Sequence, residues 1–285
     1  MTAVAGRDDR EWEGRPSEQA TAAIAESSAS SLSLSPSTSP APRPAGLRWW
    51  KELVYVLIFY GLYTVVRDTQ GQVSVSALHA FHNAQRVMRV ERDIGIFHEE
   101  AIQRAFLSWH WLLRALDVFY GSAHFIVTAV ALIWVFHKMP QRYARLRNTL
   151  AITTALALLG FAFFPLMPPR LLFTVDPSYH FVDTLQRIGG LWNFDSGTMQ
   201  KLSNQYAAMP SLHFAWSSWC VFALWPAIRN RAGRALLVAY PLLTLFCIVV
   251  TANHYILDAV GGVAVLSVGF VLAGLLGRVV EARRS

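Results

Sequence analysis

Hydrophobic residues along this chain gather in long runs that are separated by short loops rich in basic residues. Several of the runs approach the roughly 20 residues that an α-helix needs to cross a bilayer. The pattern predicts an all-α, polytopic membrane protein with about six transmembrane helices. The predicted spans cover residues 50–66, 116–137, 148–167, 211–228, 235–252 and 256–277.

Two segments outside these spans have different patterns. Between the first two spans, at about 67–111, apolar residues recur at helical spacing with charged residues between them. This pattern is typical of amphipathic helices that lie at the membrane interface. Residues 1–46 are rich in Ala, Ser and Pro and carry too little apolar surface to offset the entropy of ordering. We therefore predict a disordered tail at 1–46, a membrane domain at 47–280 and a short tail at 281–285.

The composition supports a membrane protein. Hydrophobic residues make up 54% of the 285 residues, and only 15% are charged, against roughly 25% in an ordinary soluble domain. The net charge of +7 comes from Lys and Arg in the loops, where membrane topology places them. This location does not favour nucleic-acid binding. Cys220 and Cys247 lie inside apolar runs without a metal-binding or disulfide pattern, so we expect both in the core.

The basic residues also predict the orientation in the membrane. Loops on the side that holds the N-terminus are dense in Lys and Arg, at 138–147, 229–234 and 278–285. The two longer segments on the opposite side contain basic and acidic residues in rough balance. By the positive-inside rule, the basic side is cytoplasmic. We therefore expect a multi-pass protein of the cell (plasma) membrane with both termini in the cytoplasm.

Several polar residues emerge at the predicted outer face, although they are far apart in the sequence. The end of the third span brings Arg170 to that surface, and the fourth begins with Ser211 and His213 in its first turn. The fifth span returns to the same face at a segment that carries His254 and Asp258. The topology therefore brings an Arg, a Ser, two His and an Asp to one edge of the membrane.

The spacing of His254 and Asp258 indicates a catalytic pair. Asp258 follows His254 by four residues, so on a helix the two would share a face. A carboxylate within a span is costly and normally faces a partner. An Asp that accepts a hydrogen bond from one imidazole nitrogen fixes the tautomer and leaves the other nitrogen free to attack. This is the orienting logic of a catalytic triad, with His254 as the nucleophile.

The other residues at this face suit phosphoryl transfer. A protonated His213 can give a proton to the departing oxygen. The planar guanidinium of Arg170 matches phosphoryl oxygens. Ser211 and the amides that open the fourth helix can donate to an anion. We predict a site that needs neither a metal nor a cofactor. A zinc site would need a third strong ligand and an open position, and Asp258 cannot easily orient His254 and bind a metal as well.

At these residues the chain resembles the type 2 phosphatidic acid phosphatase superfamily, which joins lipid phosphate phosphatases to vanadium haloperoxidases. The resemblance covers roughly residues 50–277. The family motif Pro-Ser-Gly-His resembles Pro-Ser-Leu-His at 210–213, and a final His-x-x-x-Asp is matched by His254 and Asp258. The resemblance implies that His254 forms a phosphohistidine, that Asp258 orients it and that His213 is the acid. It also implies a lipid phosphate substrate.

The sequence departs from two other motifs of this family. The Lys of the first motif falls at Phe163, and Arg170 is followed by Leu171 where the family has Pro. The Ser-Arg of the last motif falls at Cys247 and Ile248. Two cations that the family uses to bind phosphate are therefore missing. Phosphate binding by Arg170 is an inference from its position and chemistry.

The departures resemble the branch that contains inositol phosphorylceramide synthase-like phosphotransferases. Pro-Pro-Arg at 168–170 and Asn-His-Tyr at 253–255 are similar to that branch, as is the run from Tyr120 through His124 in the second span. By this similarity Tyr120 and His124 would bind substrate. Candidates on the outer face for the missing positive charge are Lys201, Arg187, Arg89 and Arg92.

These features predict a membrane enzyme that cleaves or transfers a phosphate ester on a lipid at the extracytoplasmic face. Water as the acceptor would make it a phosphatase, and an alcohol such as inositol would make it a transferase. The residues leave both open, as they do the oligomeric state. The expected partners are membrane lipids, the lipid phosphate and, for a transferase, a polyol. A catalytically inactive lipid-binding protein is the alternative that the missing cations raise. A transporter would place polar residues across the bilayer midplane, whereas here they gather at one edge.

Overall fold

The computed structural model describes residues 48–57, 61, 76–188 and 205–283. The chain divides into two units, Met1–Pro42 and Arg43–Ser285, and every described residue belongs to the second. The tail predicted at 1–46 and half of the first predicted span therefore lie outside the described residues.

The described part of the chain is helical and contains no β-strand, apart from an isolated bridge between Leu166 and Ala207. Four of its helices are long and apolar enough to cross a membrane. This confirms the prediction of an all-α, polytopic membrane protein. The four helices are α5 (His110–Lys138), α6 (Pro140–Phe163), α10 (Arg231–Val250) and α11 (Ile256–Ala282).

The fourth predicted span is shorter than the sequence indicated. Its helix, α9, runs from Leu212 to Leu224. Its 13 residues correspond to about 20 Å at 1.5 Å per residue, whereas the hydrocarbon core of a bilayer is about 30 Å thick. The apolar run continues beyond Leu224, but Pro226 follows and the chain turns there. The helix therefore ends before the apolar run does, and a count of six spans is not established.

The amphipathic segment before α5 forms two short helices, α3 (Ala77–Asp93) and α4 (Glu99–Phe106). In α3 the buried apolar residues recur at helical spacing, as at Ala80, Ala84 and Val87. This agrees with the helical pattern predicted for 67–111, and the position of these helices at the membrane interface remains a prediction. Between α6 and α9 the chain forms a 3₁₀ helix, η1 (Pro169–Thr174), and α7 (Thr184–Ile188).

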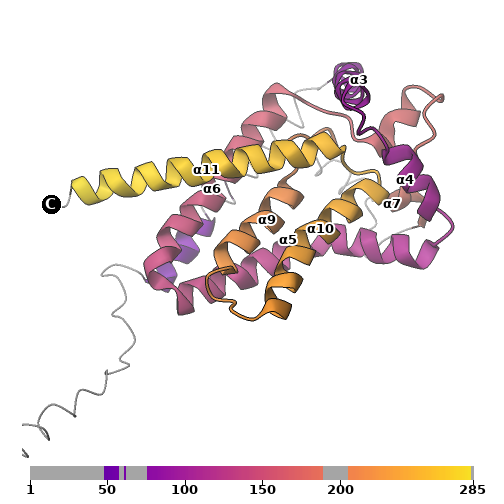
Figure 1. The fold of residues 1–285 in the computed structure, drawn as a ribbon. Helices are drawn as coiled ribbons and strands as arrows, with labels where there is room; N and C mark the ends of the chain where they lie inside the picture. Colours follow the sequence, from indigo (N-terminus) through magenta and orange to yellow (C-terminus); the bar gives the residue numbers. More distant parts are fainter. Residues whose placement is uncertain (1–47, 58–60, 62–75, 189–204, 284–285) are drawn as a thin grey trace, which may run out of the picture. The chain divides into compact units, whose positions relative to one another are not determined.

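Helix α9 lies at the centre of the bundle. It packs against α5, α6, α10 and α11 (Figure 1). A helix that is apolar on all sides is expected in such a position. Trp219 and Cys220 are fully buried there, and the Trp219 indole donates to the Leu146 carbonyl at 3.1 Å. The buried positions of Cys220 and of Cys247 in α10 agree with the prediction that both are core residues.

The start of α9 is held tightly against α11. A side chain at Gly262 would place its Cβ 2.5 Å from the Ser211 carbonyl oxygen, so only Gly fits there. Small residues allow such close approach of helix backbones in membrane proteins. The Ser211 amide also donates to the Asp258 carbonyl at 2.9 Å. This contact fixes the first turn of α9 relative to the first turn of α11.

Candidate active site

His254 and Asp258 form the contact that their spacing predicted, but not on one helix. His254 lies in the loop that precedes α11, whereas Asp258 lies in the first turn of α11. The distance from His254 Nδ1 to Asp258 Oδ2 is 3.2 Å. The contact forms because the Asp258 side chain turns back to cap the helix, where it also accepts from the Tyr255 amide at 3.0 Å. The expectation of a shared helical face is therefore wrong, although the pair itself is present.

The other nitrogen of His254 is available for chemistry. The His254 side chain is 4% exposed and Asp258 is fully buried. Among the described residues, His254 Nε2 has no hydrogen-bond partner. A carboxylate at Nδ1 favours the tautomer that carries its proton on Nδ1 and its lone pair on Nε2. The arrangement therefore suits nucleophilic attack by Nε2.

His213 and His124 lie beside this pair. His213 is the second residue of α9, and its ring centroid is 5.5 Å from that of His254. Tyr120 of α5 stacks on His213 with ring centroids 4.1 Å apart. His124, one turn later on α5, lies 4.1 Å from the His213 ring and contacts the Tyr120 carbonyl through Nδ1 at 3.1 Å. The structure thus brings Tyr120 and His124 to the two predicted catalytic histidines.

Ser211 is the N-cap of α9. Its Oγ accepts a hydrogen bond from the Phe214 amide at 3.4 Å, and the residue is fully buried. Ser is among the preferred N-cap residues because its oxygen satisfies an amide that has no partner within the helix. The sequence prediction placed Ser211 and His213 in the first turn of a helix, and the structure agrees.

Arg170 lies beside the residue that precedes His254. Its amide donates to the Ala252 carbonyl at 2.9 Å, and its Nε donates to Asn253 Oδ1 at 2.9 Å. Its Nη1 forms an ion pair with Asp183 Oδ2 at 2.6 Å. The guanidinium is therefore held in one orientation next to the His254 segment. Asn253 and Asp183 were not identified from the sequence, although Asn253 belongs to the Asn-His-Tyr run noted above.

The backbone in front of His254 is strained. Ala252 has φ of +53°, a conformation that a residue with a Cβ seldom adopts. Such strain persists where surrounding contacts over-determine it and is often found at functional sites. Here the Arg170 amide holds the Ala252 carbonyl, and Asn253 Nδ2 donates to Thr251 Oγ1 at 2.8 Å.

A second buried carboxylate was also missed. Asp117 lies one turn before Tyr120 on α5 and is 2% exposed. Its Oδ1 accepts from Thr184 Oγ1 at 3.1 Å, which joins α5 to α7. Within the described ranges, Asp117 Oδ2 has no partner. An acidic residue inside an apolar run is the signal that could have identified it.

The structure describes three of the four residues predicted as candidates for the missing positive charge. Lys201 lies outside the described residues. Arg187, Arg89 and Arg92 are exposed, and Arg92 lies over the Phe97 ring with its guanidinium carbon 4.6 Å from the ring centroid. Within the described ranges, no hydrogen bond or ion pair joins Arg187, Arg89 or Arg92 to the histidine cluster.

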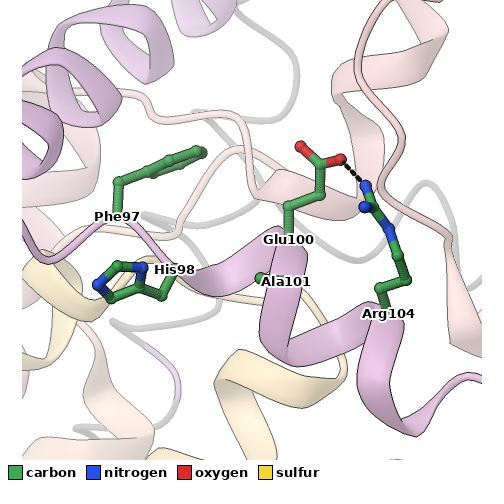
Figure 2. Close-up of a pocket in the computed structure, with 5 residues that line it drawn as sticks. All are labelled: Phe97, His98, Glu100, Ala101 and Arg104. Carbon is green, nitrogen blue, oxygen red and sulfur yellow. Dashed lines mark hydrogen bonds and ion pairs between the residues drawn. The ribbon is translucent and has the colours of Figure 1, made fainter.

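A surface pocket lies at the start of α4. Figure 2 shows its lining, in which the ion pair between Glu100 and Arg104 measures 2.5 Å. The lining contains none of the predicted site residues. In the described part of the chain, no three His, Cys, Asp or Glu side chains gather in a way that could hold a metal ion. The residues that line the pocket are Phe97, His98, Glu100, Ala101 and Arg104.

Comparison with protein-family models identifies the family of this chain. The model of the PAP2 superfamily, the type 2 phosphatidic acid phosphatases, matches residues 85–272. The chain belongs to this superfamily. The match includes every predicted site residue from Tyr120 to Asp258. Together with the apolar helices, it indicates a membrane protein with a phosphatase-type function. The comparisons with curated proteins and with solved structures found no match.

Proposed function

We propose that this protein is an integral membrane lipid-phosphate phosphatase or phosphotransferase that works through a phosphohistidine intermediate. The observation that carries the proposal is the His254–Asp258 contact at 3.2 Å, with His254 Nε2 unpartnered among the described residues and His213 beside it. This arrangement provides an oriented nucleophile and an acid on neighbouring helix starts. Membership of the PAP2 superfamily supports phosphatase-type chemistry.

In the first step, His254 Nε2 attacks the phosphorus of the lipid phosphate. A P–N bond forms while the ester P–O bond breaks, and His213 gives its proton to the departing oxygen. Asp258 stabilises the positive charge that develops on the imidazole. Arg170, Ser211 and the amides that open α9 bind the phosphoryl oxygens.

In the second step, an acceptor takes the phosphoryl group from His254. The neutral His213 removes a proton from the acceptor, the P–N bond breaks and a new P–O bond forms. Water as the acceptor releases phosphate, and an alcohol such as inositol yields a new phosphate monoester of that alcohol. Tyr120 and His124, which adjoin His213, are the proposed substrate-binding residues from α5.

The two positions that lack the family cations support the phosphotransferase branch. Phe163, at the Lys position, is 82% exposed. Ile248, at the Arg position of the last motif, is fully buried. Neither side chain can neutralise a phosphate. In this proposal Arg170 takes over part of that role, with Asn253 and Asp183 holding its guanidinium.

The proposed location is the plasma membrane, with the site at the extracytoplasmic face and both termini in the cytoplasm. Two observations support this sidedness. The junction of α5 and α6 and the junction of α9 and α10 contain the basic residues expected of cytoplasmic segments, namely Lys138, Arg142, Arg145 and Arg147 at the first and Arg229, Arg231 and Arg234 at the second. The starts of α9 and α11, where the histidines lie, are at the opposite ends of these helices.

The test is turnover of a panel of lipid phosphates by the purified full-length protein in lipid nanodiscs. His254→Ala should abolish turnover and also the radiolabelled phosphoprotein that a ³²P-labelled substrate leaves after an alkaline quench. His79→Ala, at an exposed His on α3, is the matched control and should behave as wild type. Retained turnover in His254→Ala would overturn the nucleophile assignment.

Two further measurements distinguish a phosphatase from a phosphotransferase and a metal-free mechanism from a metal-dependent one. Adding inositol or another polyol shows whether the product is free phosphate or a phosphate ester of the polyol. Vanadate should inhibit, because it mimics the phosphoryl group in transfer, and a vanadate-insensitive activity that requires a divalent ion would overturn the metal-free mechanism. Binding of the lipid phosphates without any turnover would indicate the inactive lipid-binding protein instead.

A further inference from the structure

Two glutamates from outside the proposed site cap the first turn of α11. The Ile256 amide donates to Glu99 Oε1 at 3.0 Å. The Leu257 amide donates to Glu91 Oε1 at 2.7 Å. Amides at a helix start have no partner within the helix, and the helix dipole favours negative charge there. The two carboxyl groups therefore satisfy consecutive amides in the segment that joins His254 to Asp258.

Both carboxyl groups are buried without a cation. Glu91 and Glu99 are each 0% exposed. Among the described residues, neither forms an ion pair with Lys or Arg. Two buried carboxyl groups in contact cannot both ionise without a large cost. Burial, reinforced by the neighbouring Glu99, raises the pKa of Glu91 to about 9.

One proton resolves the remaining hydrogen bonds of this pair. The second oxygens, Glu91 Oε2 and Glu99 Oε2, have no hydrogen-bond partner in the described part of the chain. A proton on Glu91 can be donated to Glu99, which leaves one net negative charge at the helix start. The carboxyl groups would then be hydrogen-bonded through both of their oxygens, as buried polar groups require.

The backbone around the pair is also fixed. The carbonyl of Glu91 accepts from the amides of Ile96 and Phe97, at 2.8 and 3.3 Å, which closes the turn between α3 and α4. The two helices therefore present their carboxyl groups as one unit. In α11, the capped amide of Leu257 directly precedes Asp258, whose carboxylate orients His254.

We propose that Glu91 and Glu99 form a proton-sharing clamp that positions the His254–Asp258 pair by holding the first turn of α11. The proposal rests on the proposed function for its effect on turnover. Glu91 and Glu99 are positioning residues, because they contact the backbone of α11 and neither histidine of the site.

The clamp predicts that Gln and Ala at position 91 have different effects, because only Gln keeps the hydrogen bonds of Glu91. Gln retains a carbonyl oxygen for the Leu257 amide, and its NH₂ group replaces the shared proton. Ala leaves the Leu257 amide and Glu99 Oε2 without partners. The matched control is Asn83→Ala, which removes a buried hydrogen bond from the same helix, α3, to the Pro165 carbonyl rather than to an amide of α11.

Hydrogen–deuterium exchange of the full-length protein in nanodiscs tests the clamp without using activity. In Glu91→Ala, the amides of residues 255–257 should exchange at least about tenfold faster, because a buried hydrogen bond is lost and the Leu257 amide is left without a partner. Glu91→Gln and Asn83→Ala should leave exchange at 255–257 as in wild type. Unchanged exchange in Glu91→Ala, or equally fast exchange in Glu91→Gln, would overturn the clamp.

Infrared spectroscopy tests the shared proton. The C=O stretching band of a protonated carboxyl group should be present in wild type at neutral pH and should lose intensity in Glu91→Gln. An unchanged band in that variant would overturn proton sharing.

Turnover then measures the effect on the site. In Glu91→Ala, kcat should fall about 100-fold, as expected when a catalytic group is misplaced by about 1 Å. KM should stay within about threefold of the wild-type value, because substrate-binding groups are retained. Glu91→Gln should restore kcat. Normal kcat in Glu91→Ala despite fast exchange would overturn the positioning role. A wild-type protein that turns over no lipid phosphate would overturn the proposed function instead, and the exchange and infrared results would still decide the clamp.

Discussion

Replacing Asp258 with Asn separates two contributions of this carboxylate to the proposed chemistry. Asp258 Oδ2 accepts from His254 Nδ1 at 3.2 Å and from the Tyr255 amide at 3.0 Å. Loss of one charge-assisted hydrogen bond costs about 1.5–3 kcal/mol, which is roughly a 10- to 150-fold loss in rate. An Asn can also donate to Nδ1, which moves the imidazole proton to Nε2 and removes the attacking lone pair.

The change of tautomer should lower the rate more than the loss of the hydrogen bond does. In other enzymes with an Asp–His pair, the change from Asp to Asn lowers kcat about 10⁴-fold while the geometry is kept. We therefore expect Asp258→Asn to lower kcat by about 10³- to 10⁴-fold, or about 4–5.5 kcal/mol in the activation free energy. The Asn carbonyl can still accept from the Tyr255 amide, so α11 should keep its cap and the protein should remain folded.

The assay is the initial rate of phosphate release from a lipid phosphate, together with the amount of phosphoprotein formed in a single turnover. Asp93→Asn, which makes the same change at an exposed position on α3, is the control and should match wild type. Thermal unfolding shows whether both variants are folded. A loss of tenfold or less in folded Asp258→Asn would refute the argument that this carboxylate sets the tautomer of His254.

Three other perturbations test separate parts of the structure. Asp183→Ala removes the ion pair that holds Arg170 at 2.6 Å. The KM for lipid phosphate should therefore rise by about tenfold or more. An unchanged KM would count against phosphate binding by Arg170. Gly262→Ala would place a Cβ 2.5 Å from the Ser211 carbonyl oxygen and should lower the free energy of unfolding by about 1–3 kcal/mol. Denaturant titration measures this change. The control is Gly277→Ala, because a Cβ at Gly277 would meet open space. The pKa of Glu91 is raised from 4.5 to about 9 in the folded protein, so the folded state binds more protons than the unfolded state within that interval. The stability of wild type relative to Glu91→Gln should therefore be greatest at low pH and should fall as the pH rises towards 9, and pH-independent differences in thermal unfolding would contradict this sign.

The sequence predicted the helices well where length and hydropathy decide them. A segment in a bilayer must satisfy its own backbone, so a long apolar run becomes a helix almost regardless of its neighbours. It predicted helix ends less well. Helix α6 begins at Pro140, well before the expected 148, because the basic loop continues as helix and Arg147 pairs there with Glu52 at 2.5 Å.

The residues of the candidate site also differ in how well the sequence could identify them. His213, His254 and Asp258 could be found from motifs because each motif is a short local pattern, and the topology placed the motifs at one face. Asp183, which holds Arg170, lies in a polar loop with no distinguishing pattern. The sequence contained no signal that this carboxylate, among several acidic residues, would face the guanidinium.

The sequence by itself determined that this protein is an all-helical membrane protein of the PAP2 superfamily and which histidines are its candidates for chemistry. Only the tertiary structure decided how these histidines are held. The Asp258 carboxylate reaches His254 through a helix cap, and Glu91 reaches the Leu257 amide across 166 positions of the chain. Apolar runs and motifs are local properties of a chain. Contacts between buried polar groups depend on which distant segments pack together, and packing is a property of the whole fold.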